Sequence, residues 1–575
     1  MKVSAIVNTL FCILLIILMH GTCAWYLNRP QDAGPDVPSG KLRSLSFAPY
    51  REGFSPIEEK FPLPQHIDED LSLLADKTYC VRTYSVRGGM EPTPGFARKY
   101  GVEMIQGGWL GDGEADNRKE IDALIQSANA NPDVVKRVIV GNEVLLRKDL
   151  TIDQLITHIR EVKQAIKQPV SYADVWSSYM KYPQLFNEVD YITIHILPYW
   201  EDEPVAIDRA VDHVEKIVKQ IEAKAREVGA NKPILIGESG WPGVGRQRGN
   251  AVPSIVNETR FIRSLIQVAN RHGFDYNIVE AFNQPWKSHN EGVVGANWGL
   301  LSIDREPVFP LTGPVSENPD WPLAFAAATA LWLGLAAAYW KRLAALPWLR
   351  LLLWLTMVQI LSICLVTLAD FLWQTSYSHW QRSYTVLIVA ANAALAALLS
   401  QRSQDILTDT QSAPTLAARL GNTYLLFSLL ALYKTYALAL NGRYLSFPVE
   451  QFAIPVIGIL GLSLCSLLRE RRFDAHSISF DRLLGSHWRA PNYRFWAYAL
   501  ALGMVGVVLG ETYEFLAAYD FIQAHPEFSE GLPVALSYTL ENRQLLAWLF
   551  CVMILSLPFW LGHRNRQRRP VPHNR

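Results

Sequence analysis

From Trp321 onward the chain is a series of long apolar runs separated by short polar loops. Each run is close to the roughly 20 residues that an α-helix needs to cross the hydrocarbon core of a bilayer. We expect about seven such helices within residues 322–563. The spans predicted from the sequence are 323–340, 351–373, 384–400, 423–440, 452–468, 495–513 and 544–562. This half of the chain therefore predicts an integral membrane protein.

The Lys and Arg residues between these runs predict an orientation. Sixteen of them lie in one set of alternate loops and in the basic tail at 564–575, whereas the other set holds three, Arg382, Arg443 and Arg543. Cytoplasmic loops carry the excess of basic residues, so the tail is expected in the cytoplasm. With seven spans, the region before Trp321 then lies on the far side. We expect a multi-pass protein of the cytoplasmic (inner) membrane with a periplasmic or otherwise extracytoplasmic domain.

The first residues agree with export. One Lys precedes an apolar stretch from about Val3 to Met19, and small residues stand at Thr22 and Ala24. This pattern is typical of a secretory signal, and residues 1–24 are either a signal peptide cleaved after Ala24 or a retained signal-anchor. Residues 25–41 and 312–321 read as linkers around the exported domain.

Residues 42–311 alternate strand-like apolar runs with charge-rich stretches that have apolar residues three and four positions apart. Such alternation indicates repeated βα units and a parallel sheet. Eight strands are predicted, at 42–50, 79–86, 102–110, 137–144, 169–176, 191–200, 233–239 and 276–286. Eight units in roughly 270 residues fit a (β/α)8 TIM barrel. The predicted fold class is thus α/β, followed by an all-α transmembrane domain.

Two of these strands end in the same way. "RVIVGNE" runs through a Gly into Glu143, and "PILIGES" runs through a Gly into Glu238. A single Glu of this kind could simply cap the strand or the helix after it. In a TIM barrel, however, the chemistry lies at the carboxyl ends of the strands, so Glu143 and Glu238 are expected to face each other across the barrel mouth.

The motifs at these strand ends resemble a known family. "VGNE" on strand four, "IGESGWP" on strand seven, "VRTYS" on strand two and the late "NQPWK…EG…NWGLLS" are similar to glycoside hydrolase family 17, the β-1,3-glucanases and related glucan transglycosylases. The resemblance covers roughly residues 42–310, and departures lie in the loops after strands six and eight. It implies a retaining mechanism with Glu143 as acid/base and Glu238 as nucleophile.

Retention requires two carboxyl groups about 5–5.5 Å apart, one ionised and one protonated. Asn142 is placed to hydrogen-bond a sugar 2-hydroxyl, and Tyr199 is expected to orient Glu238. Aromatic rings at the strand ends can bind the apolar face of a pyranose, although packing in the core is the alternative for each ring. Lys287 and Glu291 match the late polar cluster of the family. The predicted substrate-binding residues are Asn142, Tyr84, Tyr199, Trp241, Trp286, Lys287 and Glu291.

Other classes of site lack their motifs. No cluster of His, Cys and Asp has metal-ligand spacing, and no glycine-rich loop follows a strand as phosphate binding requires. Cys80 is the one cysteine of the exported domain, so no disulfide is expected within it. We expect no metal, no cofactor and no nucleic-acid partner.

Three functions remain open. The favoured one is a membrane-tethered retaining glucanase or transglycosylase that acts on β-1,3-glucan. Its binding partner is then a β-glucan oligo- or polysaccharide. A barrel that binds or guides glucan within a β-(1,3)/(1,6)-glucan synthesis system, beside a membrane glucan synthase or exporter, is the alternative. A nucleotide-sugar synthase needs a large cytoplasmic domain, and the longest cytoplasmic loop, 469–494, is short. Lys434, inside a predicted span, marks a further polar position whose role the sequence leaves open.

Overall fold

A computed structural model of the chain describes residues 3–471, 475–485 and 488–567. The chain divides into two compact units. The barrel unit comprises Pro30–Ser316 and Phe515–Val534, and the helical unit comprises Met1–Arg29, Glu317–Glu514 and Ala535–Arg575. Of the basic tail expected at 564–575, residues 568–575 lie outside the described part.

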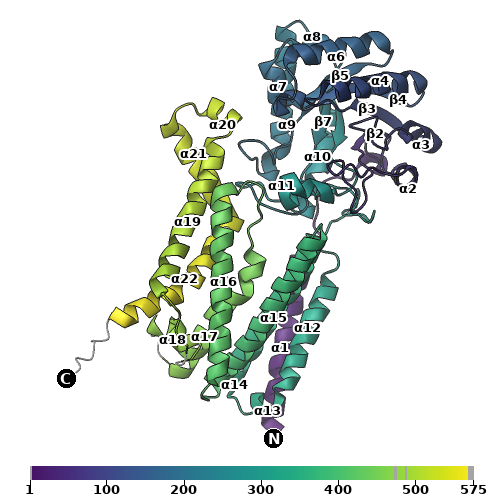
Figure 1. Cartoon of the computed structure of the whole chain (residues 1–575). Coiled ribbons are helices and arrows are strands. Elements are labelled where there is room, and N and C mark those ends of the chain that lie inside the picture. Colours follow the sequence, from purple (N-terminus) through teal and green to yellow (C-terminus); the bar gives the residue numbers. More distant parts are fainter. Residues whose placement is uncertain (1–2, 472–474, 486–487, 568–575) are drawn as a thin grey trace. The chain divides into compact units, whose positions relative to one another are not determined.

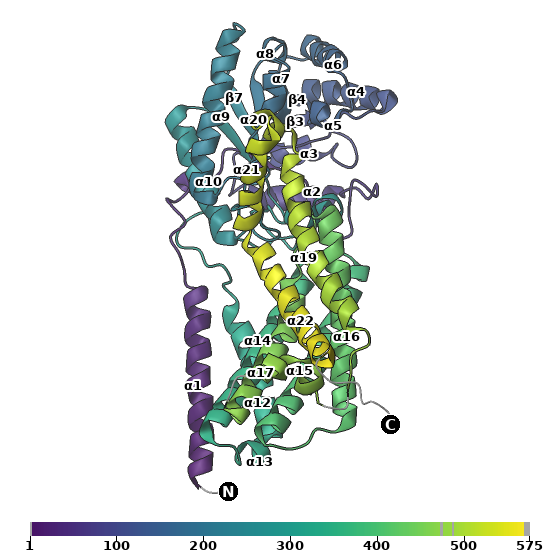
Figure 2. The same cartoon turned by 90° about the vertical axis from the view of Figure 1, so that its left-hand side faces the viewer.

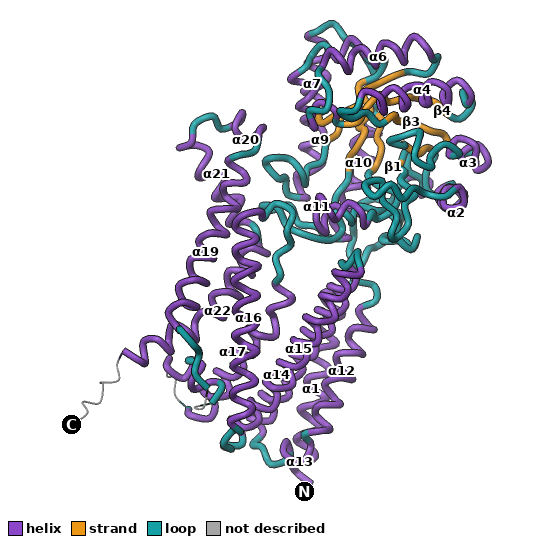
Figure 3. The backbone as a smooth tube through the Cα atoms, viewed as in Figure 1, coloured by secondary structure: helices purple, strands orange, loops and turns teal. Residues whose placement is uncertain are grey.

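The barrel unit contains a closed barrel of parallel strands, drawn in orange in Figure 3. Within the described residues, each strand pairs with the next strand along the chain from β1 to β8, and β8 pairs with β1. The strands are β1 (Leu45–Ser46), β2 (Cys80–Arg82), β3 (Glu103–Gly108), β4 (Val135–Asn142), β5 (Val170–Val175), β6 (Ile192–His195), β7 (Ile234–Ser239) and β8 (Asp275–Ile278). This arrangement confirms the predicted TIM-type fold and its eight strands.

Helices precede, connect and follow the strands, and the longer ones cover the outside of the barrel (Figure 1). They are η1 (Pro38–Gly40), α2 (Pro64–Leu74), α3 (Thr93–Tyr100), α4 (Glu114–Ala130), α5 (Val144–Arg147), α6 (Ile152–Ala165), α7 (Trp176–Lys181), α8 (Leu185–Glu188), α9 (Ile207–Glu227), α10 (Ile255–His272), η2 (Pro285–Lys287) and α11 (Ser288–Gly295). α9 shows why they form: its buried residues Ala210, Val214, Ile217 and Ile221 recur every three or four positions. This spacing gives one apolar stripe, which packs on the sheet.

Several strands are shorter than the sequence predicts, and β6 shows the reason. It ends at His195, whereas the apolar pattern continues to Trp200. Pro198 has no backbone N–H for the ladder, and Trp200 N instead donates to Leu197 O at 2.7 Å in a turn. The strand therefore stops early, and its carboxyl end lies at His195.

The helical unit consists of long apolar helices joined in places by short ones. They are α1 (Val3–Leu27), α12 (Trp321–Ala338), α13 (Trp340–Leu343), α14 (Trp348–Gln374), α15 (His379–Leu407), α16 (Pro414–Asn441), α17 (Val449–Glu470), η3 (Ala475–Ile478), α18 (Phe480–Leu483), α19 (Tyr493–Leu516) and α22 (Arg543–Gln567), with α21 (Phe528–Glu541) shared by both units and α20 (Tyr519–Ala524) in the barrel unit. Among the described residues, eight helices are long and apolar enough to span a membrane, namely α1 and seven from α12 onward. Seven of them match the spans predicted after Trp321.

α1 is packed within this unit rather than standing alone. It contacts α12 and α14. The three helices are labelled in Figure 2. Cys12 and Ile16 are buried there, and Nδ1 of His20 lies 2.8 Å from Nε2 of Gln359 on α14. These contacts are those of a helix that belongs to the bundle.

Candidate active site

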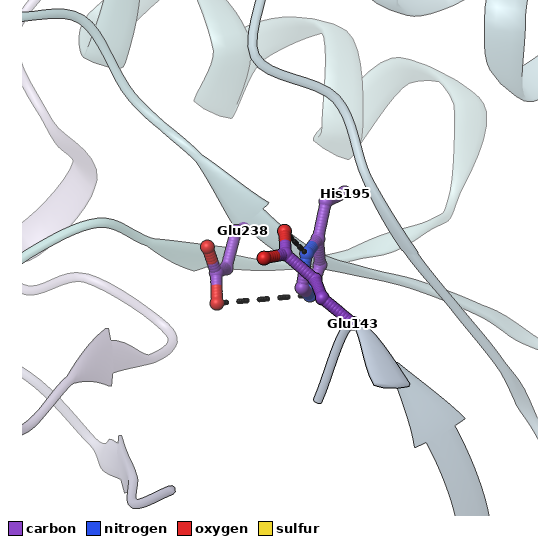
Figure 4. A group of neighbouring side chains, drawn as sticks. All are labelled: Glu143, His195 and Glu238. Carbon is purple, nitrogen blue, oxygen red and sulfur yellow. Dashed lines mark hydrogen bonds and ion pairs between the residues drawn. The ribbon is translucent and has the colours of Figure 1, made fainter. Parts of the chain in front are cut away.

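The two strand-end carboxylates predicted from the sequence meet at the mouth of the barrel (Figure 4). Glu143 directly follows β4, and Glu238 is the last but one residue of β7. Glu143, Glu238 and His195 each contribute one polar atom to a group in which all three atoms lie within 4.8 Å of one another. Residues 95 positions apart in the sequence are therefore neighbours in the fold, because parallel strands end at the same edge of a barrel.

The glycine in each motif has a steric role. Gly141 has φ +83°, and a Cβ there would lie 2.8 Å from Cγ2 of Val144. Glu143 itself adopts a left-handed conformation with φ 54°, which is uncommon for a non-glycine residue and marks a strained turn. A Cβ on Gly237 would lie 2.5 Å from Cγ2 of Thr193. Gly141 thus allows a left-handed backbone conformation, and Gly237 allows close packing against β6. Both determine where the carboxylate that follows them lies.

Positive charge surrounds Glu238. Nη1 of Arg82 donates to Oε1 of Glu238 at 3.1 Å and to the carbonyl oxygen of Gly237 at 2.7 Å. Burial would raise the pKa of the Glu238 carboxyl, but the charges of His195 and Arg82 outweigh burial, and the pKa lies below its ordinary value. Lys287 and a hydrogen bond from Tyr84 act in the same direction. Glu238 is therefore kept ionised.

Arg82 also fixes Asn142. Its Nη2 donates to Oδ1 of Asn142 at 2.5 Å. This bond orients the side-chain amide, so its NH2 group is the part that can donate to a ligand. The guanidinium lies 4.6 Å from the ring centroid of Tyr84, whose hydroxyl is 2.8 Å from Oγ of Ser46. One buried arginine thus contacts three polar groups at the carboxyl ends of β2, β4 and β7.

A second charged group lies after β8. Nζ of Lys287 is 2.7 Å from Oε1 of Glu280, which is almost completely buried. Burial raises the pKa of Glu280 to about 7 against the opposing effect of Lys287. Burial likewise raises the pKa of Glu291, whose electrostatic partners include Lys287, Glu143 and Glu238. Lys287 and Glu291 therefore belong to the electrostatic surroundings of the carboxylate pair.

Comparison with known proteins identifies the barrel. Residues 44–299 match the family model described as the BtgE/BtgC glycoside hydrolase domain. The barrel is a glycoside hydrolase domain of this type.

Individual proteins are similar to this chain over less than half of its length. A glucan 1,3-beta-glucosidase of Arthroderma benhamiae is 28% identical over 269 residues, which cover 44% of this chain and 86% of that protein. The probable family 17 glucosidase SCW10 of Saccharomyces cerevisiae is 27% identical, over 40% of this chain and 63% of that protein. A solved structure, the family 17 beta-1,3-glucanosyltransferase of Rhizomucor miehei, is 26% identical, covers 47% of this chain and 96% of that chain, and has a TM-score of 0.41.

Two aromatic residues predicted to bind substrate lie in the interior of the glycoside hydrolase domain. Tyr199 is fully buried, and its hydroxyl donates to the carbonyl oxygen of Arg246 at 2.6 Å rather than reaching Glu238. Trp241 is also fully buried, and its Nε1 donates to Val252 O at 2.9 Å. A ring with no exposed face cannot stack on a sugar. The sequence placed both residues just beyond strand ends but did not show to which side the turns direct them.

Trp286 differs from these two. It is partly exposed, its Nε1 donates to Oε1 of Gln284 at 2.7 Å, and its ring centroid lies 5.9 Å from that of Tyr50. Tyr84 is likewise partly exposed. Both rings thus keep the accessible surface that a sugar platform requires.

Three residues of the site were not predicted as functional. Arg82 lies inside the quoted motif "VRTYS", His195 lies in the apolar strand "YITIHIL", and Glu280 follows β8. Their signal in the sequence is a charged or polar side chain within an otherwise apolar strand region, since such groups are rarely buried without a partner.

Glu143, His195 and Glu238 also form a set of atoms that could ligate a metal ion. The positive charge beside these atoms disfavours the binding of a metal ion. Oε1 of Glu238, which faces His195, already accepts a hydrogen bond from the Arg82 guanidinium. A cation bound there would meet that positive charge at short range. The donor set fits an acid–base pair better than a metal centre.

Proposed function

We propose that this protein is a retaining enzyme for β-1,3-glucan, tethered to the membrane by its helical unit. The main evidence is the separation of the two carboxylates, of which one oxygen each lies within 4.8 Å of the other. Retaining glycosidases hold their carboxyl groups about 5–5.5 Å apart, whereas inverting enzymes need roughly 6.5–9.5 Å to admit a water. The names of relatives, a glucan 1,3-beta-glucosidase and a beta-1,3-glucanosyltransferase, support this substrate.

The two carboxylates take different roles because their surroundings differ. Glu238 is kept ionised by Arg82 and is the nucleophile that attacks the anomeric carbon. Glu143 has a more exposed side chain, with 25% of it accessible against 13% for Glu238, and it delivers a proton to the leaving oxygen. In the second step Glu143 removes a proton from the acceptor, and the bond between the sugar and Glu238 breaks.

The substrate is held by groups around this pair. The NH2 group of Asn142 donates to the sugar 2-hydroxyl, a contact that strengthens in the transition state. Tyr84 and Trp286 provide flat apolar surface for neighbouring sugars. Lys287 and Glu291 complete the polar rim, while Tyr199 and Trp241 support the cleft wall from within.

We infer that the natural reaction is transfer of glucan chains rather than their degradation. An enzyme fixed in a membrane meets chains that reside at the same surface, and effective concentrations between tethered partners reach roughly millimolar values. A sugar hydroxyl then competes well with water for the glycosyl-enzyme. The product is a new β-1,3 or β-1,6 linkage.

Incubation of the full-length protein in nanodiscs with laminari-oligosaccharides tests this function. Products longer than the substrate, in a proportion that rises with oligosaccharide concentration through the millimolar range, are expected. Reducing ends that accumulate in step with cleavage, with no longer product, would show a tethered hydrolase. Absence of both products would remove the enzymatic proposal.

A topology experiment tests the location. A reporter fused after Arg575 is expected to be active only in the cytoplasm, and one fused at Pro314 only outside it, since the basic loops define the cytoplasmic side. A cytoplasmic signal from the Pro314 fusion would contradict an extracytoplasmic enzyme.

A further inference from the structure

One side chain in the centre of the site lies close to both carboxylates, and the reaction as proposed gives it no step of its own. His195 ends β6, and its side chain is completely inaccessible to solvent. Nδ1 lies 2.9 Å from Oε1 of Glu143, and Nε2 lies 3.7 Å from Oε1 of Glu238 (Figure 4). The imidazole thus stands between the acid/base and the nucleophile and faces one of them with each nitrogen.

The position of the ring is set by the sheet. In the ladder between β6 and β7, His195 is paired with Glu238, and Ile196 N donates to Glu238 O at 3.0 Å. A Cβ on Gly237 would lie 3.2 Å from Cδ2 and 3.3 Å from Nε2 of His195. The ring therefore packs tightly against the β7 backbone, in a space that exists because residue 237 is glycine. A side chain held in this way can position a more exposed neighbour.

Glu143 is such a neighbour. It stands outside the strand in a left-handed turn, and its carboxyl group is partly exposed. Among hydrogen bonds within the described residues, the imidazole is the side-chain partner found for this carboxyl. The contact engages Oε1 and leaves Oε2 for the substrate.

We propose that His195 is a positioning residue of the acid/base, which holds Oε1 of Glu143 so that Oε2 alone faces the leaving oxygen and later the acceptor hydroxyl. This inference rests on the roles proposed above for Glu143 and Glu238. It adds a requirement that the roles themselves do not contain, namely that the reaction needs a hydrogen-bond donor at the place of Nδ1.

The charge balance of the reaction explains why the donor matters. Before the first step Glu238 is a carboxylate and Glu143 is protonated on Oε2. As the bond from Glu238 to the anomeric carbon forms and the glycosidic bond breaks, the Oε2 proton passes to the leaving oxygen. The negative charge has then moved from Glu238, facing Nε2, to Glu143, facing Nδ1.

The Nδ1–H bond to Oε1 consequently strengthens during proton transfer, since hydrogen bonds to charged acceptors are stronger than those to neutral ones. An interaction that is stronger in the transition state than in the ground state accelerates the step. The second step reverses the movement: Glu143 regains its proton from the acceptor hydroxyl, and Glu238 is released as a carboxylate. His195 remains in place throughout.

The test compares two substituted proteins at this position in the full chain. His195→Leu removes both nitrogens at similar volume, and His195→Asn keeps an amide donor near the place of Nδ1. On laminari-oligosaccharides, His195→Leu is expected to lower kcat/KM by about 10- to 100-fold. On an aryl β-laminaribioside with a good leaving group, which needs little acid assistance, the rate of glycosylation is expected to change by less than about threefold. His195→Asn is expected to recover most of the loss.

A matched control lies on the same domain. His213 on α9 also pairs with a glutamate, with Nε2 3.2 Å from Oε1 of Glu201. His213→Leu is expected to leave both rates unchanged, so the loss can be attributed to the site rather than to removal of any His–Glu pair.

The outcomes separate this inference from the function on which it rests. If the parent protein neither turns over glucan nor forms a glycosyl adduct on Glu238 with a 2-fluoro glycosyl fluoride, the proposed enzymatic function is wrong. The proposed role of His195 is then wrong as well. If the parent is active but His195→Leu slows both substrates equally, or slows neither, His195 is not a positioning residue and the function stands. If His195→Leu does not fold, the decision passes to His195→Asn: retention of activity on glucan within about fivefold supports the donor role, and an equal loss on both substrates overturns it.

Discussion

The barrel unit and the helical unit differ in how their buried polar groups are arranged. In the barrel, Arg82, His195, Glu238 and Glu280 are buried or nearly buried and converge on one group of strand ends. In the helical unit, most buried Ser and Thr hydroxyls donate to a backbone carbonyl of their own helix, as in Ser428, whose Oγ donates to Tyr424 O at 2.7 Å. A charged cluster that converges on a cleft is arranged for a ligand, whereas polar groups satisfied one by one are arranged for folding.

Arg402 shows that the contrast extends to charges. It is buried near the end of α15, and its guanidinium donates to the carbonyl oxygens of Leu483 and Arg482 and to Oγ of Ser412. These contacts anchor the segment that contains α18 to the bundle. Arg82 in the barrel positions reactive side chains instead, so the same residue type has a structural role in one unit and a chemical role in the other.

The largest effect expected from this comparison is that of Glu238→Gln. The substitution keeps the shape of the side chain and removes the nucleophile, so turnover of glucan is expected to fall by roughly 10⁴-fold or more. Product formation is measured by chromatography of laminari-oligosaccharides, and thermal unfolding of the same sample reports the fold. The exposed Glu114→Gln serves as the matched control. A rate comparable with that of the parent would show that Glu238 is not the nucleophile.

Glu143→Gln is expected to produce a smaller and more selective loss. Removal of a general acid costs about 10²- to 10⁴-fold on natural glucan, because the leaving oxygen must be protonated. A substrate with an activated leaving group should still glycosylate Glu238, and added azide should collect the sugar from the trapped intermediate. Formation of a β-glycosyl azide is the measurement. Equal losses on both substrates, without rescue, would exclude Glu143 as the acid/base.

Arg402→Leu is expected to affect stability and to spare catalysis. It removes the donors for two carbonyl oxygens and one hydroxyl, and hydrogen bonds to charged groups contribute about 1.5–3 kcal/mol each when measured by removal. The helical unit should unfold at lower temperature, while kcat per folded molecule stays within about twofold. The exposed Arg419→Leu is the matched control. A tenfold fall in kcat would contradict the separation of roles between the units.

The smallest effect is a pH dependence of stability that comes from Glu280. Burial raises its pKa from 4.5 to about 7, so between these values the folded chain retains a proton that the unfolded chain has lost. Its contribution to stability is complete below about pH 4.5 and declines as the pH rises to about 7, by at most about 1.4 kcal/mol per pH unit.

The Tm of the barrel should therefore fall between pH 5 and pH 7 by roughly 3–6 °C more in the parent than in Glu280→Gln. The comparison uses the change with pH within each protein, because the substitution also removes the partner of Lys287 and shifts Tm at every pH. An identical change with pH in both proteins would show that Glu280 does not titrate in this range.

The sequence by itself determined the fold class, the number of strands and the pair of carboxylates. Apolar runs of fixed length and period predict spans, strands and helices, and the repeated strand–Gly–Glu pattern predicts Glu143 and Glu238 at strand ends. These features follow from local periodicity and from the parallel topology of a barrel, which brings equivalent ends together regardless of their separation along the chain.

The tertiary structure decided which side chains complete the site. Tyr199 and Trp241 lie inside, whereas Trp286 is partly exposed, although all three follow strand ends in the sequence. His195 became part of the site because the ladder pairs it with Glu238 and Gly237 leaves room for its ring. Side-chain direction beyond the last ladder hydrogen bond depends on turn geometry and on neighbouring strands, and local sequence period carries no information about either.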